Sequence, residues 1–272
     1  MAKKKIGIVD LTVVVDRSGS MAEMREEAEG GLNAFFKKQG KEVPNTRVTL
    51  VQFDTEYEFV HRDAEITKIP KYSLIPRGGT ALLDAAGKAA AEAIERFKSK
   101  GKKISKKIFV VLTDGHENSS CEWTKSKVKD VLEQLKAEAC EVVFLGANID
   151  SFAEGAAIGV AAANTANYAP TRKGMRATMD ALCSNAVSYS TGRSSSMAYS
   201  SSQRVDMGGP TTPSVSRTSI RNLKKDKGMS WASLERAAGL GNSTLKRFAE
   251  GSTSQLSETT VDRLRSAFPE LS

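Results

Sequence analysis

Oxygen-bearing side chains gather at three points of this sequence, each beside a strand or helix signal. Asp16, Ser18 and Ser20 directly follow the β-branched run at residues 9–15. Thr80 ends a loop rich in glycine and proline, and Asp114 follows a second apolar run. Carboxylate and hydroxyl oxygens are the ligands that hard cations such as Mg²⁺ prefer. The three segments therefore supply the donors of a Mg²⁺ site, provided that the fold brings them together.

Apolar, β-branched runs alternate along the chain with segments of helical periodicity. We expect strands at residues 9–15, 47–53, 56–66, 107–113 and 141–146, and helices at residues 21–38, 81–98 and 125–139. Residues 152–158 and 174–189 then close the domain. The second and third strands form a hairpin whose outer strand is an antiparallel edge. This alternation predicts an α/β fold with a doubly wound, mostly parallel sheet. In such a sheet, loops after neighbouring strands meet at one edge, where ligands bind.

With its three pieces in this order, the sequence resembles the von Willebrand factor type A family over about residues 6–183. The metal-ion-dependent adhesion site of that family has the pattern Asp-x-Ser-x-Ser, then Thr, then Asp. The positions that match it here are Asp16, Ser18, Ser20, Thr80 and Asp114. The resemblance implies that the hydroxyls contact Mg²⁺, or alternatively Mn²⁺, directly or in alternation with water, while the aspartates act partly through water. It also implies an open coordination position for an Asp or Glu carboxylate of a partner protein.

Each fragment taken alone has a simpler interpretation. Asp and Ser after a strand are ordinary turn and helix-cap residues, and Thr80 alone would be read as a helix cap. The order of the three pieces, each at the end of a predicted strand or loop, is what favours the metal site.

Cysteine content and the absence of targeting signals favour a cytoplasmic protein. The start at residues 1–5 is basic, but the apolar run behind it contains Asp10 and lacks a small-residue cleavage site. No run approaches the length of a membrane span. The three cysteines, Cys121, Cys140 and Cys183, have no CxxC spacing, which indicates neither a disulfide framework nor a structural zinc site.

The chain of 272 residues is longer than a usual single domain, and its composition changes after residue 183. We predict a first domain at residues 1–183, a flexible serine-rich linker at residues 184–216 and a second domain at residues 217–272. The formal charge of +8 points weakly to an anionic partner. Residues 217–272 hold ten Lys and Arg against six Asp and Glu, which favours nucleic acid modestly.

The last segment resembles the Cro/cI-like helix-turn-helix domains of phage repressors over about residues 217–271. One helix ends at Gly239, and a second opens at Asn242 or Ser243. The resemblance implies that four residues face the base edges of double-stranded DNA and that Arg247 lies nearer a phosphate; the four are Asn242, Ser243, Thr244 and Lys246. Trp231 departs from the pattern, because many relatives carry a glutamine there. The alternative is a small helical bundle used for protein contact.

Enzymatic functions have little support. No GxxxxGK[ST] phosphate loop occurs, and His61 and His116 are the only histidines, too few to suggest a hydrolytic triad or a zinc site. We therefore expect no catalysis, and predict a cytoplasmic Mg²⁺-dependent protein-binding module tethered to a DNA-binding helix-turn-helix, a phage or mobile-element regulator or adaptor. One alternative is an accessory subunit of an AAA+ ATPase. Another, a Mg²⁺-dependent nuclease, would need more carboxylates than Asp16 and Asp114.

Overall fold

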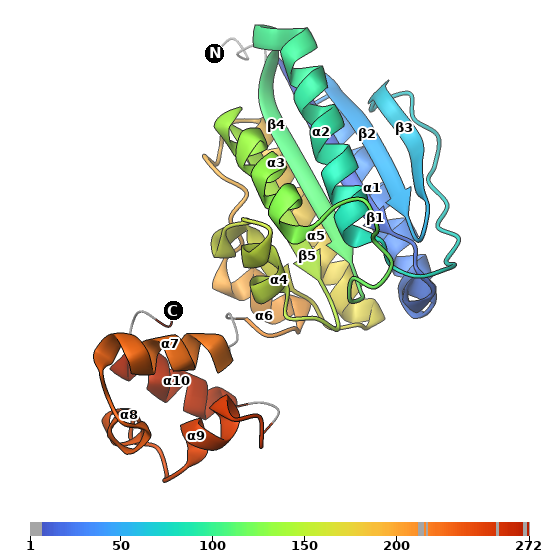
Figure 1. Cartoon of the computed structure of the whole chain (residues 1–272). Helices are drawn as coiled ribbons and strands as arrows, with labels where there is room; N and C mark the ends of the chain where they lie inside the picture. The colour runs from blue at the N-terminus through green and yellow to red at the C-terminus, as the bar shows by residue number, and fades with distance from the viewer. Residues whose placement is uncertain (1–6, 212–214, 216, 254–255, 269–270, 272) are drawn as a thin grey trace. The chain divides into compact units, whose positions relative to one another are not determined.

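The computed structural model forms two compact units, Met1–Thr212 and Pro213–Ser272 (Figure 1). It describes residues 7–211, 215, 217–253, 256–268 and 271, so the basic start at residues 1–5 lies outside the described residues. Each unit encloses apolar clusters of its own. Among the described helices, none is both long enough and apolar enough to cross a membrane.

The first unit is built on one six-stranded sheet with the strand order β3-β2-β1-β4-β5-β6. The strands are β1 (Ile8–Asp16), β2 (Thr46–Phe53), β3 (Tyr57–Glu65), β4 (Ile104–Thr113), β5 (Cys140–Gly146) and β6 (Thr165–Asn167). All neighbours pair in parallel except β3, which pairs antiparallel with β2 at the edge. The predicted α/β class and mostly parallel sheet are confirmed. The sequence pattern does not predict β6, because three residues are too few to show a strand's periodicity.

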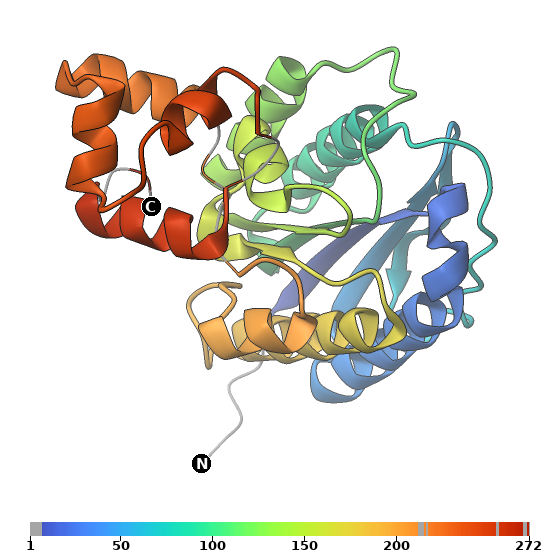
Figure 2. The same cartoon turned by 90° about the horizontal axis from the view of Figure 1, so that it is seen from below.

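Helices cover both faces of this sheet, as Figure 2 shows. The first unit includes the helices α1 (Arg25–Glu42), α2 (Leu82–Lys100), α3 (Lys125–Ala137), α4 (Ser151–Ala157) and α5 (Arg172–Ser190), and α6 (Ser201–Met207), described below. One apolar cluster joins the sheet to α1 and α5, and another joins it to α2 and α3. Val13 belongs to the first cluster and Val14 to the second, because successive side chains of a strand point to opposite faces. The central strands are therefore buried on both sides.

The serine-rich segment predicted as a linker is largely folded onto the first unit. α6 (Ser201–Met207) follows α5 and begins with a capping box between Ser200 and Gln203. Met197 and Met207 are fully buried in the cluster that contains α1 and α5. The prediction of a linker over residues 184–216, with a first domain ending at residue 183, is therefore wrong, and the division falls after Thr212. Residues 212–214 and 216 of that predicted linker lie outside the described residues.

A buried arginine explains how this polar segment is held. Arg204 on α6 is 8% exposed and donates to the carbonyl oxygens of Ala162, Ala163 and Thr165. It thereby attaches α6 to the start of the edge strand β6. Serine content conceals this arrangement, because a few Met, Tyr and Arg side chains make the contacts.

The second unit packs four described helices around its own core: α7 (Arg217–Lys227), α8 (Trp231–Ala237), α9 (Thr244–Ala249) and α10 (Glu258–Ala267). Ile220, Leu234, Leu245 and Leu264, one from each helix, are fully buried together. Between α8 and α9 the chain turns at Gly239, whose φ of 62° lies in the left-handed region that glycine adopts without strain. The predicted order of helix, glycine turn and helix is present. Membership of the Cro/cI-like family stays a prediction.

The folded state of the segment around α6 can be tested by substitution. Met207→Ala should lower the free energy of unfolding of the first unit by about 2–5 kcal/mol, because it leaves a cavity in a core. Val205→Ala on the same helix is the matched control, since Val205 is 65% exposed. Urea denaturation followed by Trp123 fluorescence, in a Trp231→Phe background, reports the first unit alone. Equal stability of the two variants would contradict the packed arrangement.

Candidate metal centre

Asp16 is the last residue of β1. This strand lies between β2 and β4, near the middle of the sheet. Its side chain is fully buried. Oδ1 accepts a hydrogen bond from the backbone N–H of Ser18 at 2.7 Å, and Oδ2 accepts one from the hydroxyl of Thr113 at 2.6 Å. The first bond closes the turn after β1, and the second joins that turn to the end of β4. The carboxylate is thus fixed in place by its own strand end and by the neighbouring one.

A short chain of contacts connects the other predicted ligands. Ser18 Oγ lies 3.1 Å from Ser20 Oγ, and Ser20 Oγ donates to Asp114 Oδ1 at 2.6 Å. The hydroxyls of Thr80 and Ser20 both lie next to Gly115. A Cβ atom placed on Gly115 would be 3.5 Å from Ser20 Oγ and 3.5 Å from Thr80 Oγ1. The structure therefore brings together all five residues that the sequence predicts as metal ligands.

Burial changes the acidity of both carboxyl groups. It raises the pKa of Asp16 above its ordinary value, although hydrogen bonds from Thr113 and Ser18 act against the shift. Burial also raises the pKa of Asp114 to about 6, against the hydrogen bond from Ser20 and with the help of the neighbouring charge of Asp16. Two carboxyl groups therefore share a site from which water is largely excluded. A nearby positive charge would stabilise the ionised form of each.

These residues fit a divalent cation such as Mg²⁺. The donors are all hard oxygens, with two carboxylates to balance the charge of the ion. Asp114 Oδ2 is buried and has no hydrogen-bond partner among the described residues, a situation that costs free energy unless another ligand satisfies the oxygen. Gly115 leaves room beside Ser20 and Thr80 that a side chain would fill. The site thus contains an unsatisfied anionic oxygen close to hydroxyl groups that could bind the same ion.

The loop between β4 and α3 is bound to the chain around the start of α2. Asn118 Oδ1 accepts the backbone N–H of Thr80 at 2.9 Å. Glu117 accepts the N–H of Leu83 at 2.9 Å and that of Ser120 at 2.7 Å. These bonds hold the segment with Thr80 against the loop that follows β4. The sequence offers no signal for this role of Glu117, because a single acidic residue in a loop is an ordinary surface residue.

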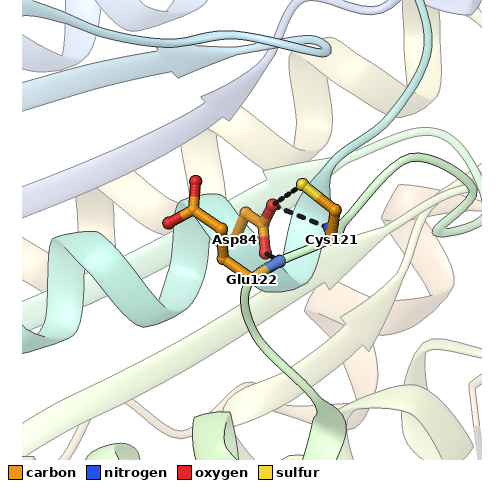
Figure 3. Close-up of side chains that lie close together, drawn as sticks. All are labelled: Asp84, Cys121 and Glu122. Carbon is orange, nitrogen blue, oxygen red and sulfur yellow. Dashed lines mark hydrogen bonds between the residues drawn. The ribbon is translucent and has the colours of Figure 1, made fainter.

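A second group of side chains that could bind a metal also lies at the loop after β4 (Figure 3); it consists of Asp84, Cys121 and Glu122. Its hydrogen bonds show that it holds the loop in place. Asp84 accepts backbone N–H groups from Cys121 at 3.0 Å, Glu122 at 3.0 Å and Trp123 at 2.7 Å. Burial acts to raise the pKa of Asp84, but these N–H groups lower it below its ordinary value. Glu122 pairs with Lys88 at 2.7 Å. Since the oxygens of Asp84 already have partners, we assign no metal to this group.

The candidate metal centre reaches the surface on one side. Asp16, Ser18, Thr80 and Asp114 are buried, whereas Ser20 is exposed. The exposed side chains in the loops that carry these donors include Ile75, Arg77 and His116. Ile75 is 66% exposed, an unusual level for a large apolar side chain in this protein. A partner side chain can therefore approach the site from the side of Ser20.

The five residues predicted to contact DNA lie in the second unit, in the turn before α9 and on its exposed side. Exposed positions are Asn242, Ser243, Lys246 and Arg247, and Thr244 is partly buried. The turn is held by Glu235 of α8, which is 3% exposed and accepts the N–H groups of Ser243 at 2.9 Å and Leu245 at 2.8 Å. Ser243 does not cap α9 with its own side chain. The predicted contact residues are thus accessible, and a buried carboxylate fixes the start of their helix.

Solved structures of other proteins share the fold of the first unit. The pilus adhesin SpaC from Lactobacillus rhamnosus GG is 14% identical with a TM-score of 0.53, over 68% of this chain and 30% of the adhesin. The von Willebrand factor domain of a type V pilus tip protein from Porphyromonas gingivalis is 12% identical with a TM-score of 0.51, over 67% of this chain and 96% of that domain. The match to proximal thread matrix protein 1 from the mussel byssus covers 46% of that protein. At identities of 14% and 12%, the likeness to the first two structures is one of fold alone.

The family follows from the sequence itself. No curated protein sequence gives a significant match to this chain. The sequence profile of the von Willebrand factor type A domain matches residues 10–173, which is more than half of the chain and includes all five candidate ligands. The chain therefore belongs to the von Willebrand factor type A domain family.

Proposed function

We propose that the first unit binds Mg²⁺, with Mn²⁺ as the alternative ion, and uses it to bind a partner protein. Asp16, Ser18, Ser20, Thr80 and Asp114 would hold the ion. The observation that carries this proposal is Asp114 Oδ2, a buried carboxylate oxygen without a partner among the described residues, next to three hydroxyls and a second carboxylate. A divalent cation satisfies that oxygen and offsets the charge of both aspartates.

The role of the chain's own residues follows from their burial. The buried carboxylates fix the position of the ion, and the exposed side of Ser20 leaves the site open to solvent. Mg²⁺ retains water readily, so an Asp or Glu carboxylate of the partner can replace a water there. This is a binding function. We propose no catalysis, since Asp16 and Asp114 are the only carboxylates in the described hydrogen-bonded chain of the site.

The proposed cellular setting is the cytoplasm. Three free cysteines, two of them buried, fit a reducing cytoplasm. We propose a regulator or adaptor of a phage or mobile element, and the alternative is an accessory subunit of an AAA+ ATPase, with the second unit used for protein contact. Measuring the hydrolysis rate of an ATPase encoded beside this chain, with and without the protein, distinguishes the two.

A second candidate function concerns the second unit, for which we propose binding to double-stranded DNA. The observation that favours it is the exposure of Asn242, Ser243, Lys246 and Arg247 together at the start of one helix. Amide and hydroxyl groups read base edges, and cations contact phosphates or guanine. The turn before this helix is fixed by Glu235, so little conformational entropy would be lost on binding.

The metal assignment predicts that Asp16→Asn abolishes Mg²⁺ binding by the full chain. Asparagine retains an acceptor for the N–H of Ser18, so the turn after β1 should remain folded while the charge that attracts the ion is removed. Asp130→Asn is the matched control, because Asp130 is an exposed carboxylate on α3. Isothermal titration calorimetry measures the affinity, and affinity capture of partner proteins with and without EDTA measures the consequence. Equal Mg²⁺ affinity of the two variants would refute the assignment.

The raised pKa values predict how this binding depends on pH. Only the deprotonated carboxyl of Asp114 binds a cation, and its pKa is about 6 in the metal-free protein. Mg²⁺ affinity should therefore rise as the pH increases through about 6 and level off above it, with up to about a tenfold reduction for each pH unit below. The raised pKa of Asp16 acts in the same direction. Calorimetry from about pH 5 to about pH 7.5 would show the change, and a flat profile would contradict it.

The DNA proposal predicts distinct effects for two kinds of substitution. Replacing Lys246 and Arg247 with Ala should weaken duplex binding by about 1–3 kcal/mol for each side chain that reads a base, and should reduce its salt dependence for each side chain that pairs with a phosphate. Asn242→Ala should change sequence preference more than overall affinity. Lys225→Ala on α7 is the control for removal of an exposed charge. Fluorescence anisotropy of the full chain at two salt concentrations measures these effects, and binding no tighter than that of a lysine-matched peptide would leave protein contact as the function of this unit.

A further inference from the structure

A buried carboxylate lies next to the candidate metal centre without contacting it. Asp54 follows the end of β2 and is 1% exposed. Its Oδ2 atom accepts hydrogen bonds from Arg17 Nε at 2.9 Å and from Arg77 Nε at 2.7 Å. Its Oδ1 atom accepts the backbone N–H of Glu56 at 2.7 Å, and its carbonyl oxygen accepts the N–H of Ala81 at 2.8 Å. One residue thus contacts three separate segments.

The two arginines belong to the two loops that carry the hydroxyl ligands. Arg17 stands between Asp16 and Ser18, and Arg77 lies three residues before Thr80. The same loops also meet through their backbones, because Arg77 N donates to Arg17 O at 2.8 Å and Gly19 N donates to Gly78 O at 3.2 Å. The loop after β1 and the loop before α2 are therefore held together at the place where Asp54 binds both arginines.

The charges make this contact sensitive to the carboxylate. The Arg17 side chain is 6% exposed and its ion pairs are with Asp54 and Glu58, while the side chain of Arg77 is half exposed and also pairs with Glu56. Both guanidinium groups contact the same oxygen, so they would repel each other if the carboxylate were absent. Burial acts to raise the pKa of Asp54, but the hydrogen bond from Arg77 and the charge of Arg17 lower it below its ordinary value. Asp54 is therefore ionised at neutral pH, as this role requires.

We propose that Asp54 is a positioning residue of the metal centre, which sets Mg²⁺ affinity by holding the loop with Ser18 and the loop with Thr80 at a fixed separation. The inference rests on the proposed metal-binding function. Asp54 acts through Arg17 and Arg77 and makes no contact with the ion. Residues that orient metal ligands in this way typically change metal affinity by about 10–100-fold when they are replaced.

The alternative is that Asp54 only stabilises the β2–β3 hairpin through its bond to the N–H of Glu56. A matched control separates the two roles. Asp63 on β3 is also a carboxylate that pairs with two cations, Arg47 and Lys100, and none of its partners belongs to the loops of the metal centre. Asp63→Asn therefore reports the removal of a doubly paired carboxylate from the same hairpin without a change at the metal loops.

The experiment compares Mg²⁺ affinities by calorimetry for the unchanged full chain and for Asp54→Asn, Arg77→Ala, the double variant Asp54→Asn/Arg77→Ala, and Asp63→Asn. Thermal melting in EDTA gives the stability of each metal-free protein. We expect Asp54→Asn to weaken Mg²⁺ binding by at least about tenfold and Asp63→Asn to leave it within about twofold, whatever their melting temperatures. The double variant should bind Mg²⁺ about as weakly as Asp54→Asn alone, because both substitutions break the same link.

Each other result overturns the inference. Mg²⁺ affinity of Asp54→Asn equal to that of Asp63→Asn would make Asp54 a hairpin residue only, and full additivity in the double variant would show that Asp54 does not act through Arg77. Should Asp54→Asn fail to fold, Arg77→Ala decides: an affinity reduced more than about threefold supports the link, and a smaller reduction refutes it. If the unchanged protein binds no divalent ion, the proposed function fails first, which is distinct from failure of the role of Asp54.

Discussion

The burial of two carboxylates at the ends of adjacent parallel strands is the constraint on which the candidate metal centre depends. Asp16 and Asp114 lie where β1 and β4 end side by side, both almost without solvent contact. Like charges in such a place destabilise each other, and hydrogen bonds from Ser20 and Thr113 offset only part of that cost. The part of this cost that is not offset raises the pKa of Asp114. A fold that keeps this arrangement is one in which a cation would contribute to the stability of the native state.

Carboxylates that are not candidate ligands hold the three loops around that pair. Asp54 joins the loop after β1 to the loop before α2, while Glu117 and Asp84 join the start of α2 to the loop after β4. Each of them accepts several hydrogen bonds at once, mostly from backbone N–H or guanidinium groups. The candidate ligands are thereby held in position in the metal-free protein, so that binding of an ion, as proposed, would not need to order the loops. Such preorganisation favours affinity, because the entropy of ordering is already lost on folding.

The sequence predicts which candidate ligands lie together, but not the carboxylates that hold their loops in place. The convergence of Asp16, Ser18, Ser20, Thr80 and Asp114 was predictable because each stands at a recognisable strand or loop end, and strand ends of a parallel sheet converge. Asp54 and Glu117 give no such signal, since the partners through which they join separate loops lie far away in the sequence and come close only once the chain is folded. The segment with α6 was misleading for a related reason. Its composition is polar, and its attachment depends on Arg204 and on two buried methionines, which composition does not reveal.

A buried carboxylate also holds the start of a helix in the second unit. Glu235 on α8 accepts the N–H groups at the start of α9, as Glu117 does at the start of α2. The start of an α-helix leaves N–H groups without intrahelical partners and carries a partial positive charge, so an acidic side chain satisfies both. In α9 the side chain of Ser243 makes no capping hydrogen bond, and both Asn242 and Ser243 are exposed. A capping carboxylate from a neighbouring helix therefore fixes the turn while the polar side chains of the turn itself stay accessible to a partner.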